Sequence, residues 1–325
     1  MTELQPTHSF DEMLANLKAA PDWQQLPDIR LAMSPQHVTF VDDVSDKTMF
    51  NERYMESHVF VGKMAFALYG TCGAFVATST VLAIAITHDV LAKKSLGDIA
   101  FQYGIMVVFA VLMVALAYFF GRSEPACVRF NRQAQVVHIY QSPGKAITAA
   151  WREVHPFTKF RPPGEGSFSL KLVFRIGTAD WVVAPGAFDF GDDSSLSDNL
   201  LRLEFLRRYM AEGLGSIQPD PARGAYKPSG FSKAVSLKDD HLITFLFAKL
   251  VALPGYYLAG GPLIDRYLLR RAANLQWPAE VEQLCAHDAD LSGYDTTPVQ
   301  ANKSIFHRFN GQGFDLVDIN GIVLG

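Results

Sequence analysis

The sequence predicts an α+β membrane protein with a two-helix transmembrane hairpin, a small β-roll closed by a helix, and a mostly helical C-terminal region. Three observations support this fold class. Two long runs, Met64–His88 and Ile99–Gly121, contain no Asp, Glu, Lys or Arg. Short runs rich in β-branched and aromatic residues follow between Val128 and Phe188. The spacing of the apolar residues then changes to that of a helix over Ser197–Glu212.

Each uncharged run is long enough to cross a membrane. Both exceed the ~20 residues that span the ~30 Å hydrocarbon layer as a helix, and both carry aromatic residues or histidine near their ends. The alternative is a pair of helices buried in a large soluble core, but two uncharged runs of this length are rare in soluble domains. The short connector Asp89–Asp98 makes the pair an antiparallel hairpin. Small residues at helical spacing predict a close approach of the two helices, at Gly70, Gly73, Ala74 and Ala77.

Basic residues near the ends of the hairpin predict its orientation. The connector carries Lys93 and Lys94. The other side carries six basic residues, namely Lys47, Arg53, Lys63, Arg122, Arg129 and Arg132. Because cytoplasmic loops of membrane proteins are enriched in Lys and Arg, we expect a multi-pass protein with both termini in the cytoplasm.

The pattern divides the chain into four segments. Residues 1–57 form a cytoplasmic N-terminal segment, 58–122 the hairpin, 123–215 the β domain, and 216–325 a C-terminal helical region with a closing hairpin. In the first segment, "SFDEMLANLKAA" predicts a short helix with Ser9 as its N-cap. The stretch "HVTFVDD" (His37–Asp43) alternates like a short strand.

The β domain is predicted to contain about five strands and one helix. The strands are "VRFNR", "QVVHIYQ", "AITAAWREV", "SLKLVFRI" and "WVVAPGAF". In the fourth strand, Leu170, Leu172 and Phe174 alternate with Lys171, Val173 and Arg175, which is typical of a sheet with one wet face. The helix is predicted to begin at a Ser197 cap and to stop at Gly213. These elements form a meander or small barrel closed by the helix.

Two resemblances follow from these motifs. The order "FNRQAQVVHIY", "WREV" and a terminal helix resembles the bacterial pleckstrin-homology-like domains, which often follow a two-helix membrane hairpin. The wider pattern of "ERYMES", "VRFNRQAQVVHIY", "AAWREV" and "NLQWPAEVEQLC" resembles a family of bacterial two-span membrane proteins often encoded beside type VI secretion effectors. The resemblance covers most of the chain. It implies a pleckstrin-like β-roll and a location in the bacterial inner membrane.

Composition and charge limit the partners of the protein. The net charge of -4 gives no reason to expect nucleic acid as a partner. Acidic and basic residues alternate through the β domain, without the cluster of basic residues that marks lipid-headgroup recognition. We therefore expect this domain to dock a protein. Trp151 is expected to be a core aromatic rather than a ligand contact. Three cysteines at unrelated spacings fit a reducing compartment.

The C-terminal region contains a second apolar stretch. His241–Ile264 is long enough to suggest a third span, but Lys249, Pro254 and Pro262 interrupt it. A helix at the membrane surface, or one packed on the β domain, is the better prediction. The helix "DRYLLRRAANLQ" follows and carries Arg266, Arg270 and Arg271 on one side. These arginines either contact anionic phospholipid or form a solvated face. "FNGQGFDLVDINGIVLG" predicts a closing hairpin.

The sequence predicts no catalytic, cofactor-binding or metal-ligating residues. "DADLSGYD" (Asp288–Asp295) imitates the start of a calcium loop, but the twelfth position is Val299 rather than a bidentate Glu. An acidic surface turn is the better interpretation. The histidines are dispersed, without a Cys or carboxylate at ligand spacing. We therefore expect a protein that is not an enzyme and that needs no cofactor.

These observations favour an inner-membrane protein-binding factor. The resemblance implies an immunity or accessory protein of a type VI secretion effector system, whose partner is a cognate toxin or effector. The phospholipid bilayer is its second partner. Two alternatives stay open: a membrane-damaging secreted effector that acts through the hairpin and His241–Ile264, and a lipid-sensing membrane scaffold.

Overall fold

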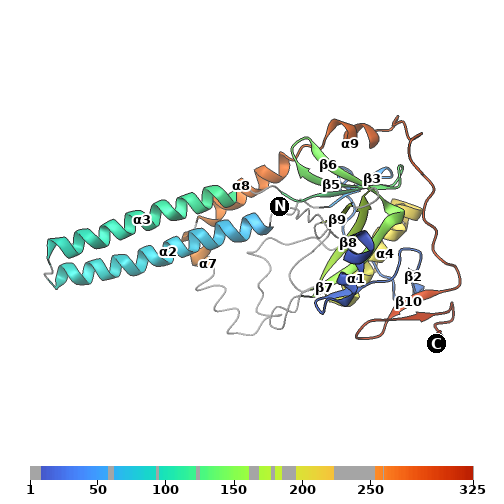
Figure 1. The fold of residues 1–325 in the computed structure, drawn as a ribbon, viewed down its shortest axis with the longest axis horizontal. Helices are drawn as coiled ribbons and strands as arrows, with labels where there is room; N and C mark the ends of the chain where they lie inside the picture. Colours follow the sequence, from blue (N-terminus) through green and yellow to red (C-terminus); the bar gives the residue numbers. More distant parts are fainter. Residues whose placement is uncertain are drawn as a thin grey trace. The chain divides into compact units, whose positions relative to one another are not determined.

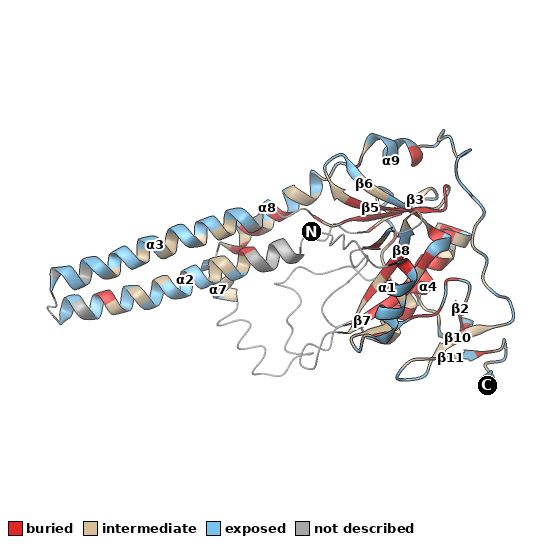
Figure 2. Cartoon of the chain, in the orientation of Figure 1, coloured by how far each residue is buried: buried red, intermediate tan, exposed pale blue. Residues whose placement is uncertain are grey.

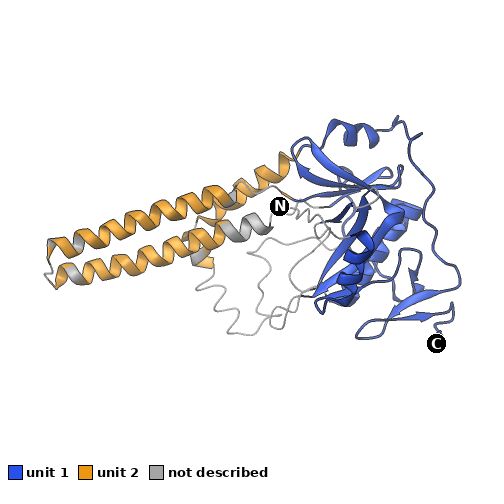
Figure 3. Ribbon diagram, in the orientation of Figure 1, with its two compact units in different colours: residues 1–58, 126–228, 276–325 blue, residues 59–125, 229–275 orange. Residues whose placement is uncertain are grey.

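The computed structural model describes residues 9–57, 62–92, 95–121, 125–160, 168–176, 180–184, 195–222, 253–258 and 260–324. The described residues form seven α-helices and three β-sheets, so the fold is α+β (Figure 1). The chain divides into two compact units (Figure 3). Unit 1 comprises residues 1–58, 126–228 and 276–325, and unit 2 comprises residues 59–125 and 229–275.

The first sheet of unit 1 combines an N-terminal strand with three strands from the predicted β domain. Its order is β1 (Trp23–Gln25), β7 (Val154–Phe160), β8 (Phe168–Ile176) and β9 (Asp180–Ala184), and every neighbouring pair is antiparallel. In β1, Gln24 lies opposite Thr158 of β7. The N-terminal segment therefore contributes an edge strand to this sheet.

The second sheet also takes its edge strand from before the hairpin. Its order is β3 (Tyr54–Glu56), β4 (Val128–Asn131), β5 (Val136–Ser142) and β6 (Lys145–Ala150), again antiparallel. The single strand predicted over "AITAAWREV" was wrong, because a 3₁₀ turn at Trp151–Glu153 divides it into β6 and β7. Trp151 is buried and packs edge-on against Phe130, with ring centroids 5.9 Å apart. Trp151 is thus a core aromatic, as expected.

Helix α4 (Leu196–Glu212) closes the core of unit 1. Leu200, Leu203 and Leu206 are buried in one cluster with residues of both four-stranded sheets. The predicted stop is confirmed, because Gly213 is the C-cap and adopts a φ of 93°. The predicted cap was wrong. Ser195, two residues earlier, accepts from the backbone of Asp198 and forms a capping box with its side chain.

The prediction of one wet face on the β8 sheet was only partly right. Leu170, Leu172 and Phe174 are buried in the main core. Val173 points to the opposite face and is also fully buried, in a separate cluster with Phe10 and Met13. Both of these residues belong to α1 (Phe10–Ala19), which begins at the predicted Ser9 cap. A helix from the N-terminal segment therefore covers part of the predicted wet face.

The third sheet joins the chain's end to its beginning. The predicted closing hairpin is present as β10 (Phe306–Phe309) and β11 (Phe314–Val317), which pair antiparallel. Strand β10 also pairs in parallel with β2 (Ala32–Met33). The strand predicted over His37–Asp43 was wrong, because His37 ends a 3₁₀ turn that begins at Pro35 and residues 38–43 form no strand. Pro35 cannot donate to a β ladder, so the extended run ends before it.

Unit 2 contains the predicted hairpin. Helices α2 (Gly62–Leu91) and α3 (Leu96–Gly121) lie side by side and antiparallel (Figure 1). Within them, Leu68–His88 and Ala100–Phe119 are long and apolar enough to cross a membrane. Only 6% of the first window and 0% of the second are buried, and Figure 2 shows both helices mostly exposed. Such exposure is typical of side chains that face lipid.

The predicted close approach through small residues was wrong. A Cβ added at Gly70 or at Gly73 would meet nothing within 4 Å. Ala74 and Ala77 are also exposed. The two helices instead make contacts through larger side chains, such as the stacked rings of Phe75 and Phe109, whose centroids lie 6.5 Å apart. Gly70 and Gly73 therefore do not mediate a close helix–helix contact.

Two more helices complete the described part of unit 2. Helix α7 (Leu253–Leu258) and helix α8 (Gly261–Ala273) follow each other, and both contact α2. Helix α8 confirms the helix predicted from "DRYLLRRAANLQ" and begins four residues earlier, at Gly261. For the predicted apolar stretch His241–Ile264, residues 241–252 lie outside the described residues.

Candidate functional site

The three sequence-predicted site residues lie on α8 in unit 2. Arg266 and Arg270 are exposed, and Arg271 is half-buried. Arg266 and Arg270 are four positions apart, so both point from the same face of the helix. Arg271 is turned toward the side that packs. The structure thus brings two of the three arginines together on one exposed surface.

The opposite face of α8 is packed on the hairpin. Ile264 and Leu268 are buried in a cluster with Leu68 of α2, and Ala117 of α3 packs against this cluster. Leu68 begins the first apolar window, and Ala117 lies near the end of the second. Helix α8 therefore packs where the first apolar window begins and where the second nears its end.

A polar contact fixes the same helix in place. The Asp265 carboxylate accepts hydrogen bonds from the hydroxyl groups of Tyr69 on α2 and Tyr256 on α7. Gly261 is required beside it, because a Cβ there would overlap the ring of Tyr256. The carboxylate therefore ties α2, α7 and α8 together and sets which face of α8 is exposed.

Unit 1 contains a second polar cluster, which the sequence did not predict. Arg129 of β4 donates from Nε to Oε2 of Glu56 at 2.8 Å, and its Nη2 lies 2.7 Å from the same oxygen. Its Nη1 lies 3.1 Å from Oε1 of Glu282, on α9 (Ala279–Leu284). The guanidinium also lies over two aromatic rings, with centroids 4.5 Å away for Tyr54 and 4.8 Å for Trp277. A buried cation is thus paired on its edges and covered on its faces.

The charges of this cluster change the pKa values of its neighbours. Burial would lower the pKa of Arg129, but the carboxylates of Glu56 and Glu282 outweigh it and raise the pKa. Burial, with Arg129 opposite it on β4, lowers the pKa of His138 to about 3. Burial and the Glu56 carboxylate raise the pKa of the Cys127 thiol. His138 is therefore neutral at neutral pH, and Cys127 remains a protonated thiol rather than the nucleophilic thiolate.

The cluster holds the C-terminal segment on the second sheet. Asn131 donates from Nδ2 to the Leu284 carbonyl at 3.0 Å. Gln133 donates from Nε2 to the carbonyls of Leu284 and Ala286, at 2.8 and 2.9 Å. These contacts join residues more than 150 positions apart in the chain, as do Trp277 and Glu56, whose indole Nε1 and carboxylate are 3.2 Å apart.

Three of the sequence motifs noted above meet in this cluster. "ERYMES" supplies Tyr54 and Glu56, "VRFNRQAQVVHIY" supplies Arg129, and "NLQWPAEVEQLC" supplies Trp277 and Glu282. Their residue types are explained by one structural task, the docking of three distant segments. An arginine inside an apolar strand was the signal that could have revealed the site, because a buried Arg requires partners.

A third polar cluster connects α4 to the small sheet. The Glu204 carboxylate is fully buried and accepts from Arg207 Nε and Nη2 at 2.8 Å and from Arg208 Nε at 2.7 Å. It also accepts from the backbone of Met33 in β2 at 3.1 Å. Burial lowers the pKa of the nearby His307 to about 4. As in the Arg129 cluster, the charged side chains bind one another, and here they hold α4 against β2.

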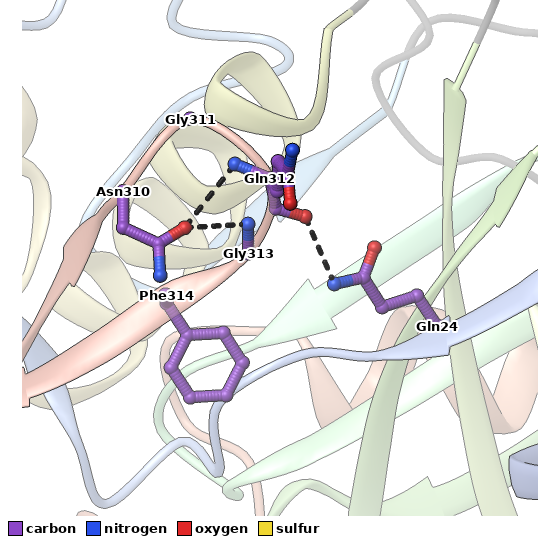
Figure 4. Close-up of a pocket in the computed structure, with 6 residues that line it drawn as sticks. All are labelled: Gln24, Asn310, Gly311, Gln312, Gly313 and Phe314. Atoms are coloured by element: carbon purple, nitrogen blue, oxygen red, sulfur yellow. Dashed lines mark hydrogen bonds between the residues drawn. The ribbon is translucent and has the colours of Figure 1, made fainter.

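An open hollow in unit 1 lies between β1 and the β10–β11 turn. It has a volume of about 730 Å³ and is lined by Gln24, Asn310, Gly311, Gln312, Gly313 and Phe314. Figure 4 shows the lining side chains, with Gln24 Nε2 donating to the Gln312 carbonyl. The Asn310 side chain accepts from the backbone of Gln312 and Gly313 and so shapes the turn. The residues that line the hollow are uncharged, so the hollow offers no charge with which to select a ligand.

The acidic turn at Asp288–Asp295 uses its carboxylates locally. Asp290 accepts from the backbone of Ser292, and Asp295 accepts from that of Thr297 and pairs with Arg152. Within the described ranges, no three His, Cys, Asp or Glu side chains are grouped so as to hold a metal ion.

Comparisons with known protein families, with curated proteins and with solved structures found no match to this chain.

Proposed function

We propose that this chain is a membrane-anchored protein-binding factor. In this proposal α2 and α3 lie in the bilayer, and unit 1 is the binding module in the cytoplasm. The observation that carries it is that almost no residue of two long apolar helices is buried, on a chain whose other unit has its own buried core. Apolar side chains exposed over this length are stable in lipid and unstable in water.

Unit 1 is, in this proposal, a pleckstrin-like roll. The order of its elements supports this idea, since β4–β5–β6 form one antiparallel meander, β7–β8–β9 form a second, and α4 follows. Leu203 and Leu206 of α4 are buried in the core between these strands. The added edge strands β1 and β3 make the unit larger than the roll alone.

The proposed partner is a toxic effector of a type VI secretion system, and the chain its immunity or accessory protein. The resemblance of the sequence motifs supports this role. A membrane anchor raises the local concentration of the binding unit for a partner that acts at the membrane.

Expression of the full chain in a naive bacterium tests the proposal. The chain is produced alone and together with the product of each neighbouring gene, and growth and co-purification are measured. The proposal expects no harm from the chain alone, rescue from one toxic neighbour, and co-purification with it. An unrelated two-span protein produced at the same level controls for general effects on the membrane.

Two other outcomes have definite meanings. Toxicity of the chain alone indicates the membrane-damaging effector instead. If the chain neither harms, rescues nor co-purifies with a neighbour's product, the immunity role is wrong.

A further inference from the structure

Exposed side chains change character along α7 and α8. Near the start of this pair, Tyr257, Leu258 and Leu263 are exposed by 60, 72 and 69%. One and two turns further along, the exposed residues include Arg266 and Arg270. Basic side chains therefore join the exposed apolar ones along α8.

The packing of α8 on the hairpin places its exposed residues near the end of an apolar window. Its buried residues Ile264 and Leu268 pack at Leu68, where the first apolar window begins. In a membrane, the end of an apolar helix lies at the boundary between hydrocarbon and headgroups. The exposed leucines of α7 and α8 are then suited to the hydrocarbon, and the arginines to the headgroup phosphates.

We propose that Arg266 and Arg270 bind the phosphate groups of anionic phospholipids in the bilayer that holds α2 and α3. This inference rests on the membrane anchoring proposed above and is independent of the protein partner. Arginine is suited to this task, because its planar guanidinium donates two parallel hydrogen bonds to phosphate. The bonds from Tyr69 and Tyr256 to Asp265 keep these arginines on the exposed face.

The helix dipole alone does not explain the arrangement. Basic residues in the last turn stabilise a helix, and Arg270 and Arg271 lie in the last turn of α8. Arg266 lies before that turn, where the dipole has little effect. Leu258, Leu263 and Leu269 are also exposed along the same two helices, and a group of exposed apolar side chains is typical of a contact surface rather than of a purely solvated face.

The full chain in detergent, with its bound lipid counted by native mass spectrometry, tests the proposal. The probes are short-chain phosphatidylglycerol and phosphatidylcholine. The parent should bind phosphatidylglycerol more tightly, and Arg266→Gln/Arg270→Gln should weaken that binding about thirty-fold, the effect of two basic side chains at an anionic surface. Arg266→Lys/Arg270→Lys should recover part of it, because charge returns without the bidentate geometry.

A second double variant controls for net charge. Lys145→Gln/Lys303→Gln removes two exposed charges from unit 1 and should leave the preference for phosphatidylglycerol unchanged. Equal binding of both lipids by the parent, or an equal loss in both double variants, would overturn the proposal. A separate experiment tests the membrane anchoring by washing cell membranes with alkaline carbonate. Release of the chain by this wash would overturn the anchoring and this inference with it.

Discussion

Arg129 and Glu56 face each other across neighbouring strands β4 and β3 and form a two-point ion pair inside unit 1. The Arg129 side chain is 6% exposed and that of Glu56 is 16% exposed. The third member of the cluster differs, since the Glu282 side chain is 54% exposed. One buried cation therefore has one largely buried and one exposed carboxylate partner, and the two carboxylates should contribute unequally to stability.

Replacement of each carboxylate by its amide measures this difference. Glu56→Gln leaves a buried guanidinium without its main counter-charge and should lower the free energy of unfolding by about 3 kcal/mol. Glu282→Gln affects a solvent-screened contact and should change the free energy of unfolding by less than about 1 kcal/mol. For a unit of this size, about 3 °C of the melting temperature corresponds to 1 kcal/mol. Near-UV circular dichroism of the full chain in detergent, followed on heating, gives both values.

Equal effects of the two substitutions would contradict the unequal partnership. A similar loss of unfolding free energy in both variants would mean that the docking of α9, rather than burial of the Arg129 charge, determines stability. No loss in either would mean that Arg129 remains hydrated in the folded protein.

The sequence predicted the elements whose signals are local. The two apolar helices follow from length and composition, α1 from its capping box, and the β10–β11 hairpin from its Asn-Gly turn and alternating apolar residues. Each signal lies within one stretch of a few residues or turns. Such signals are independent of how distant segments meet.

Contacts between distant segments account for most of what the sequence did not predict. Gln24 of β1 pairs with Thr158 of β7, across 134 positions of the chain, and neither residue has a feature that selects the other. The break at Trp151 depends on the burial of its ring against Phe130. The Arg129 cluster needs three segments at once. On α8, in contrast, the arginines were predicted, but only the packing of Ile264 showed which of them are exposed.

The N-cap of α4 can be tested by two substitutions two residues apart. Ser195 Oγ accepts from the Asp198 backbone at 3.1 Å, and Ser195 N donates to the Asp198 carboxylate at 2.7 Å. Ser195→Ala should therefore cost about 1 kcal/mol. Ser197→Ala lies in the first turn, where alanine is the better helix former, and should be neutral or slightly stabilising. Hydrogen exchange of the first turn of α4 distinguishes the two, and a larger loss with Ser197→Ala would favour the cap predicted from the sequence.

Two buried histidines should make unit 1 less stable in mild acid. Burial lowers the pKa of His138 to about 3 and that of His307 to about 4, from an ordinary value of 6.5. At a pH between the folded-state pKa of each histidine and 6.5, the unfolded chain binds a proton that the folded chain does not. The free energy of unfolding therefore falls as the pH decreases through this range. From pH 7.5 to pH 5 each histidine should contribute a loss of about 2 kcal/mol.

Melting temperatures of the full chain in detergent at these two pH values check the expectation. His138→Asn/His307→Asn removes both titrating groups, so its melting temperature should fall less between pH 7.5 and pH 5 than that of the parent. The comparison is between pH values within each protein, which cancels any loss from the substitutions themselves. An identical fall in both proteins would assign the acid sensitivity to carboxylates.

The orientation of the hairpin is tested from outside the cell. Because the connector carries only Lys93 and Lys94 while six basic residues lie on the other side, the connector should face outward and unit 1 should face the cytoplasm. With the native cysteines replaced, Ser95→Cys in the connector and Lys145→Cys on β6 each introduce one exposed thiol. A membrane-impermeant maleimide should label the first in intact cells and both after lysis. Labelling after lysis shows that each thiol is reactive, so protection in intact cells reflects sidedness alone. The reverse pattern, with only Lys145→Cys labelled in intact cells, would place unit 1 outside and exclude a cytoplasmic partner.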